Sequence, residues 1–257
     1  MYPSIDIFGR SIPTYGLMAA AGIVCGLLFV LFLSKLFKTD AENAAFIFTF
    51  GFIGAGVGGK LLYLLISIPD IIASCRQNGF LNTLIAYTQG GLVFYGGLLG
   101  AIAGAFITAK YLKLDIKEYY PALVPGIALF AGLGRIGCFL GGCCYGAHTD
   151  SRFCVIFPSG GHAPAGVPLV PVQLYEAVFE GAAAIILVVL AKTRPQIRRY
   201  LLMIYCASYA VFRFILEFWR GDEIRGLWGG LSTSQWISLG ILAVIAFIAL
   251  KRNIKAI

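Results

Sequence analysis

Four polar residues near the end of one apolar segment have the spacing of a binding site. Tyr209, Arg213, Glu217 and Arg220 are separated by four, four and three residues, which stacks them on one face of an α-helix. Charges inside an apolar segment are costly, and they mark either a functional site or an internal ion pair. Arginine binds phosphate oxygens through two parallel hydrogen bonds, so this face predicts a site for an anionic group. A purely structural ladder, Arg213–Glu217 with Glu217–Arg220, is the alternative interpretation.

Two further cations, Lys60 and Arg135, also lie inside apolar segments. Arg135 stands in the run 132–137, in which glycines permit close helix contact or close approach of a ligand to the backbone. The long stem of Lys60 could instead carry its ammonium group to the membrane interface. The same glycine argument applies to residues 90–97, where helix packing is an equally good explanation.

The elements that must position these residues are transmembrane helices. Of the 257 residues, 59% are hydrophobic and 12% are charged, whereas soluble domains carry about 25% charged residues. Apolar runs near the ~20 residues that cross a bilayer recur along the whole chain. We therefore predict an all-α integral membrane protein that forms a single domain over residues 1–257. The predicted spans are 15–37, 44–68, 91–112, 119–141, 171–191, 199–219 and 233–250.

The distribution of Lys and Arg predicts the orientation of the seven spans. Of 20 such residues, three lie inside spans and five flank one side, which leaves twelve on the other side. The five are Arg10, Arg76, Arg152, Arg220 and Arg225. We therefore expect the N-terminus outside and the C-terminus in the cytoplasm, with the long loops 69–90 and 142–170 outside. The basic residues cluster between spans as topology requires, so the net charge of +8 does not indicate nucleic-acid binding.

This orientation predicts that polar groups from several helices meet near the outer leaflet. The three cations within spans lie in the last third of outward-running helices. The inward-running helices begin with further polar residues: Tyr15, Tyr95, Gln173, Tyr175, Glu176, Ser234 and Gln235. We expect a pocket for an anionic phospholipid whose tails stay in the membrane. The residues alone do not separate an enzyme from a lipid transporter or binding protein, although the uninterrupted apolar inner halves of the helices argue against a path through the membrane.

Three cysteines follow the arginine of the fourth span: Cys138, Cys143 and Cys144. Their C-x4-C-C spacing differs from the C-x2-C pairs of structural zinc sites, so we expect no metal. A disulfide among them, or with Cys75 or Cys154, is one alternative in an oxidising compartment. Packing as small apolar side chains is the other.

Seven short motifs, in order along nearly the whole chain, resemble those of the prolipoprotein diacylglyceryl transferase family. They are IPTYGLM (12–18), GGKLLY (58–63), GGLVFYGG (90–97), GRIGCF (134–139, followed by Gly141, Tyr145 and Gly146), PVQLYEA (171–177), RFILEFWRGD (213–222) and LS with Gln235 (231–235). The resemblance implies transfer of diacylglyceryl from phosphatidylglycerol to the lipobox cysteine of a preprolipoprotein. The product is a thioether, glycerol phosphate leaves, and no cofactor is needed. The implied location is a bacterial cytoplasmic membrane, with the active site toward the outer leaflet.

The chain departs from the family pattern at several positions. Tyr95 stands where the family commonly has a His that is a candidate for proton handling, and Lys60 stands where an Arg is usual. Cys138 and Cys143 replace an Asn and a Glu, and Gly141 replaces another Asn. A related enzyme that uses the same lipid but another acceptor therefore remains an alternative.

The expected site combines the residues that carry these arguments. As catalytic residues we predict Arg135, Arg213, Tyr209, Glu217 and Tyr95. As substrate-binding residues we predict Arg135, Arg220, Lys60, Gln173, Glu176 and Tyr15. In this scheme the arginines bind the phosphate region while Glu217 and Tyr209 orient it.

Overall fold

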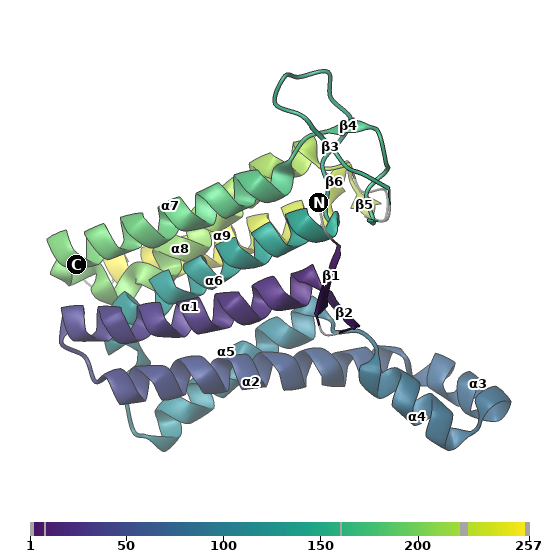
Figure 1. Ribbon diagram of the computed structural model, residues 1–257. Helices are drawn as coiled ribbons and strands as arrows, with labels where there is room; N and C mark the ends of the chain where they lie inside the picture. The colour runs from purple at the N-terminus through teal and green to yellow at the C-terminus, as the bar shows by residue number, and fades with distance from the viewer. Residues whose placement is uncertain (1–2, 8, 160, 222–225, 255–257) are drawn as a thin grey trace. The chain divides into compact units, whose positions relative to one another are not determined.

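The computed structural model describes residues 3–7, 9–159, 161–221 and 226–254, and these residues are predominantly helical (Figure 1). They form two compact units. The first unit comprises Met1–Phe29 and Tyr120–Ile257, and the second comprises Val30–Tyr119. Helix α1 (Thr14–Phe37) therefore contributes its beginning to one unit and its end to the other. Asp222 and Arg225, which entered the sequence argument, lie outside the described residues.

Among the described residues, the first unit is built from the start of α1 and four long helices that begin at Tyr120 or later. Its elements are β1 (Ser4–Ile7), β2 (Arg10–Pro13), α6 (Tyr120–Gly141), β3 (Val155–Ile156), β4 (Pro168–Leu169), α7 (Val172–Thr193), η2 (Pro195–Tyr200), α8 (Leu201–Leu216), η3 (Glu217–Trp219), β5 (Leu227–Trp228), β6 (Leu231–Ser232) and α9 (Thr233–Ile254). The strands pair two by two in antiparallel hairpins: β1 with β2, β3 with β4, and β5 with β6. The all-helical prediction missed these hairpins because each strand has only two to four residues.

Small residues let the helices of the first unit approach closely. Helix α6 packs against α7, and α8 packs against α9 (Figure 1). A Cβ atom added at Gly132 would lie 3.2 Å from the Cβ atom of Glu180. A Cβ atom added at Gly137 would lie 2.9 Å from the Cβ atom of Met18, so α1 also lies directly against α6. The helix that carries Arg135 is therefore held between α1 and α7.

The second unit is organised around a close pair of helices, α2 (Ala41–Ile66) and α5 (Phe94–Tyr111). Along the chain, α3 (Ile68–Asn78) and α4 (Phe80–Gln89) connect α2 to α5, and η1 (Ile116–Glu118) follows α5. Glycines line the contact: Gly54 and Gly58 on α2, and Gly96, Gly100 and Gly104 on α5. A Cβ atom at Gly100 would collide with the carbonyl oxygen of Gly54 and lie 3.0 Å from the Cα atom of Gly58. Such backbone contact is how helices associate in lipid, where the hydrophobic effect between them is absent.

We expect Gly100→Ala to destabilise the second unit by about 1–3 kcal/mol, because the backbones of α2 and α5 must separate to admit the methyl group. The measurement is the thermal unfolding midpoint in detergent. Gly56→Ala is the matched control, because a Cβ atom there would meet nothing within 4 Å and alanine is intrinsically the better helix former. Equal midpoints for both variants would contradict this packing argument.

Within the described residues, six helical segments are long and apolar enough to cross a membrane, or seven if the bent pair α4–α5 counts as one span. The six are Thr14–Phe37, Ala41–Ile66, Tyr120–Gly141, Val172–Thr193, Pro195–Trp219 and Thr233–Lys251. They agree with six predicted spans to within a few residues. The seventh predicted span, 91–112, corresponds to α5 alone, which meets α4 at an angle of 73°.

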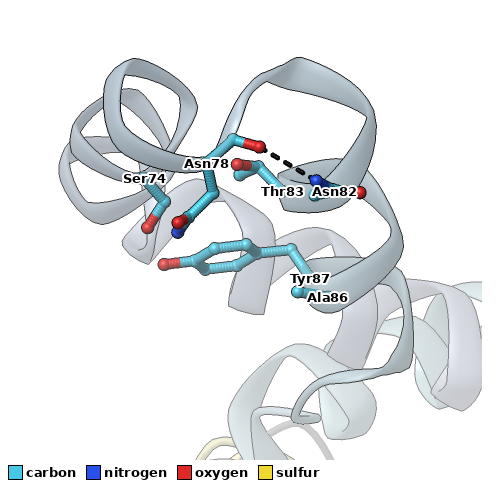
Figure 2. Close-up of a pocket in the computed structure, with 6 residues that line it drawn as sticks. All are labelled: Ser74, Asn78, Asn82, Thr83, Ala86 and Tyr87. Carbon is cyan, nitrogen blue, oxygen red and sulfur yellow. Dashed lines mark hydrogen bonds between the residues drawn. The ribbon is translucent and has the colours of Figure 1, made fainter.

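The prediction of a long loop over residues 69–90 is wrong, because this segment forms the helical hairpin α3–α4. Hydropathy missed α3 because its apolar and polar residues alternate with helical periodicity instead of forming one apolar run. Gly79, with φ 78°, makes the tight connection between the two helices. A pocket of about 340 Å³ lies between them. Figure 2 shows the residues that line it: Ser74, Asn78, Asn82, Thr83, Ala86 and Tyr87. The Asn82 side chain donates to the Asn78 carbonyl oxygen at 3.1 Å across this hairpin (Figure 2).

Candidate functional site

Glu176 is the centre of a buried cluster of charges in the first unit. It lies in the second turn of α7 and is completely buried. Its Oε2 atom lies 3.1 Å from Nε of Arg135 on α6, and its Oε1 atom lies 3.9 Å from Nε of Arg213 on α8. One carboxylate therefore holds together two arginines from two other helices.

The guanidinium group of Arg213 has further polar contacts, on the side away from Glu176, with Glu217 and Ser234. Its Nη2 atom lies 2.9 Å from Oε2 of Glu217 and donates to Oγ of Ser234 at 3.3 Å. Its Nη1 atom is buried and has no hydrogen-bond partner within the part of the chain that the structure describes. A buried cationic donor without a partner is costly, unless a ligand supplies the acceptor.

The two arginines differ in exposure. The Arg135 side chain is 25% exposed, and the Arg213 side chain is 12% exposed. Tyr209, one turn before Arg213, lies close enough to the Arg135 side chain to interact with it electrostatically. Phe179 stacks on Phe212 at 4.1 Å between ring centroids, and its ring centroid lies 6.2 Å from that of Tyr209. The site thus holds fixed positive charge, and one of its two arginines is partly exposed.

The loop after α6 joins the charged cluster through backbone contacts. The buried Gln173 side chain donates to the carbonyl oxygen of Cys143 at 2.7 Å. Gly146 and Arg220 form an isolated antiparallel bridge. A Cβ atom on Gly146 would lie 2.8 Å from the Trp219 carbonyl oxygen and would collide with that of Val170, so only glycine permits this approach. Arg220 is in this way placed beside the loop that carries two of the cysteines.

Of the ten predicted site residues, eight belong to the first unit. The structure brings Arg135, Arg213, Glu176, Glu217 and Tyr209 into one connected group. Gln173 and Arg220 adjoin the loop after α6. Tyr15 of α1 packs on Gly137 of α6, and its ring would lie 3.4 Å from a Cβ atom placed on that glycine. Lys60 and Tyr95 belong to the second unit.

In the second unit, Lys60 is engaged within the fold. Its ammonium group donates to the carbonyl oxygens of Tyr87 and Gly90, at 2.8 and 2.6 Å, and lies 5.0 Å from the ring centroid of Tyr63. These carbonyls end α4 at the bend toward α5, where a cation is favoured. Tyr95 follows the bend and is 47% exposed.

The Lys60 ammonium group is a donor to two carbonyl oxygens at this bend. We expect Lys60→Met to destabilise the protein by about 1–3 kcal/mol, because both carbonyl groups would lose this hydrogen-bond donor. The measurement is the thermal midpoint in detergent, together with protease sensitivity between α4 and α5. Lys110→Met, at an exposed position in the last turn of α5, is the control. A midpoint unchanged by Lys60→Met would show that the two hydrogen bonds contribute little.

The sequence argument missed two features of this region. It paired Arg213 with Glu217, which the structure bears out, but it gave Glu176 only a secondary part. It also missed Glu180, a buried residue one turn further along α7 that accepts a hydrogen bond from Tyr205 at 2.9 Å. The available signal was a second carboxylate inside a span, four residues after the first.

The three cysteines after Arg135 lie together. The Sγ atoms of Cys138, Cys143 and Cys144 all lie within 4.8 Å of one another. All seven cysteines, which fall within the described ranges, are free thiols. Hydrogen bonds from the Cys138 and Cys143 side chains hold the pKa of Cys144 well below its usual value, and the positive charges of Arg220 and Arg135 act in the same direction against burial.

Comparisons with known proteins match nearly the whole chain. Residues 4–251 match the family described as "Prolipoprotein diacylglyceryl transferase". The chain is 37% identical to phosphatidylglycerol–prolipoprotein diacylglyceryl transferase 2 of Clostridium perfringens, over 92% of this chain and 90% of that protein. It is 35% identical to the phosphatidylglycerol–prolipoprotein diacylglyceryl transferase of Clostridium tetani, over 95% and 94%. It is 33% identical to that of Geobacter sulfurreducens, over 87% and 84%.

Proposed function

The chain belongs to the prolipoprotein diacylglyceryl transferase family, and on that premise we propose how its own residues carry out the transfer. The chain is a transferase of lipoprotein maturation that uses phosphatidylglycerol. In the proposed reaction, the thiolate of a lipobox cysteine attacks the glyceryl carbon that bears the phosphate. A carbon–sulfur bond forms, the carbon–oxygen bond to the phosphate breaks, and glycerol phosphate leaves with the electron pair.

The observation that carries the proposed site is the pair of arginines held by one buried carboxylate. The leaving phosphate gains negative charge as the carbon–oxygen bond breaks, so donors fixed in advance stabilise the transition state. Glu176 fixes Arg135 and Arg213 at 3.1 and 3.9 Å. The Nη1 atom of Arg213 offers a donor for a phosphate oxygen, and the partly exposed Arg135 offers the point of entry.

The other residues of the first unit support this pair. Glu217 holds the Nη2 atom of Arg213 and so orients its guanidinium plane. Tyr209 contacts Arg135 and is suited to share a phosphate oxygen with it. Arg220 adds positive charge beside the loop after α6, which Gln173 anchors. In this scheme Glu176 and Gln173 position other groups, whereas the arginines touch the phosphate.

The setting of the reaction follows from the apolar helices. They indicate a multi-pass membrane protein, and we assign it to the bacterial cytoplasmic membrane with the N-terminus outside. The preponderance of Lys and Arg on the opposite side supports this orientation. The site then faces the outer leaflet, where both the lipid donor and an exported preprolipoprotein are accessible.

The test combines the purified protein, in liposomes that contain phosphatidylglycerol, with a lipobox peptide. We expect the peptide to gain the mass of diacylglyceryl while glycerol phosphate is released in equal amount. A peptide with Cys→Ser serves as the control and should remain unmodified. Glycerol phosphate released without peptide modification would point to another acceptor, and lipid binding without either product would point to a binding or transport protein.

A further inference from the structure

The three thiols of Cys138, Cys143 and Cys144 have the arrangement of a metal-binding site. Their Sγ atoms lie within 4.8 Å of one another, which is compatible with joint coordination of one ion. Cys138 is buried in the last turn of α6, whereas the other two are partly exposed. The spacing along the chain argued against a metal, but the positions of the thiols in space support one.

The backbone is shaped to bring these thiols together. Gly142 and Cys144 both have positive φ angles, 70° and 58°. The left-handed conformation is unfavourable for a residue with a Cβ atom, and it persists where the surroundings impose it, often at functional sites. The backbone amide of Cys143 donates to the Cys138 carbonyl oxygen at 3.1 Å. The side-chain amide of the buried Gln173 donates to the Cys143 carbonyl oxygen at 2.7 Å. The turn is therefore fixed at both ends.

Metals bind cysteine in its thiolate form. Two cations lie near the cluster: Arg135 precedes Cys138 on α6, and Arg220 is bridged to Gly146 in the loop after the helix. Three thiolates around a divalent cation carry a net charge of −1, which these arginines offset. Soft sulfur ligands select zinc over magnesium or calcium.

We propose that Cys138, Cys143 and Cys144 bind one zinc ion and leave its fourth position open for the thiol of the acceptor cysteine. Three protein ligands with one open position is the arrangement of catalytic zinc sites, whereas structural sites are closed by four. The two partly exposed cysteines leave one side of the cluster accessible. This inference rests on the proposed transferase function, and it names the group that activates the acceptor.

The step balances without any oxidant or reductant. The acceptor thiol binds zinc as a thiolate, and its proton passes to water or to a hydroxide that it displaces from the ion. The thiolate then forms the carbon–sulfur bond while glycerol phosphate leaves toward the arginines, and zinc stays divalent throughout. The acceptor thus reaches its reactive form without Tyr95 acting as a base.

The first measurement is the metal content of the full-length protein, purified without chelators. We expect about one zinc per chain, and we expect each of Cys138→Ser, Cys143→Ser and Cys144→Ser to weaken zinc binding roughly 10-fold or more. Cys25→Ser is the matched control, because this exposed cysteine belongs to α1 and not to the cluster. Protein without zinc whose cluster contains a disulfide, or free thiols that bind no added zinc, would overturn the proposal.

The second measurement tests the open position independently of turnover. In protein reconstituted with Co²⁺, sulfur-to-cobalt charge-transfer absorption reports the number of bound thiolates. We expect this absorption to rise when the lipobox peptide is added, and to stay unchanged with its Cys→Ser form. A charge-transfer absorption that does not change when the lipobox peptide is added would overturn the role of the metal ion in binding the acceptor thiol.

The two proposals can fail separately. Full transferase activity in zinc-free protein would overturn the zinc proposal and leave the proposed function intact. Stoichiometric zinc with a normal peptide response, but without any lipid transfer, would support the metal site and contradict the transferase. Loss of transfer on zinc removal, restored by zinc alone, is the result that supports both.

Discussion

Arg213→Lys is expected to lower transferase activity about 100-fold or more while the protein stays folded. Lysine keeps the positive charge but has a single nitrogen in place of a planar fork. It cannot contact Glu176, Glu217 and a phosphate oxygen at the same time, as the Nε, Nη2 and Nη1 atoms of arginine are arranged to do. The measurement is the initial rate of peptide modification in liposomes.

Arg194→Lys is the matched control, because Arg194 is exposed at the end of α7, far along the chain from the charged cluster. We expect the control to retain parental activity. The thermal midpoint of each variant separates lost chemistry from lost fold. Parental turnover by well-folded Arg213→Lys protein would remove the basis for assigning Arg213 to the phosphate.

Glu176→Gln is expected to have the largest effect on stability. The substitution leaves Arg135 and Arg213 buried without the carboxylate that they share. Removing one partner of a buried ion pair costs about 3–5 kcal/mol, and the partial exposure of Arg135 favours the lower end of this range. Activity should fall as well, because the two guanidinium groups lose their common anchor.

The comparison variant is Glu118→Gln, at an exposed residue of η1 that lies in the other unit. Both variants lose one negative charge, so a general effect of net charge would lower both midpoints equally. We expect only Glu176→Gln to unfold at a clearly lower temperature in detergent. Addition of phosphatidylglycerol should narrow the difference if its phosphate supplies the missing negative charge.

Much of this protein follows from local sequence patterns. Six spans follow from apolar runs whose length the bilayer fixes. The Arg213–Glu217 ion pair follows from i,i+4 spacing on one helix. The glycine-rich runs 90–97 and 132–137 indicated close approach of a helix or a ligand, and Gly96, Gly132 and Gly137 lie in contacts between helices. The hairpin α3–α4 was not found by hydropathy, because an amphipathic helix has no continuous apolar run.

Contacts between helices were decided by the tertiary structure alone. The sequence determined that Arg135, Glu176 and Arg213 lie inside apolar segments, but not that one carboxylate joins both arginines, because each residue comes from a different helix. It determined that Lys60 lies inside an apolar segment, but the fold decided that its ammonium group binds the carbonyl oxygens at the end of α4. The C-x4-C-C spacing gave no metal pattern, whereas a left-handed turn at Gly142 and Cys144 brings the three thiols together. Periodicity fixes which face of a helix a residue occupies, and only packing fixes what that face meets.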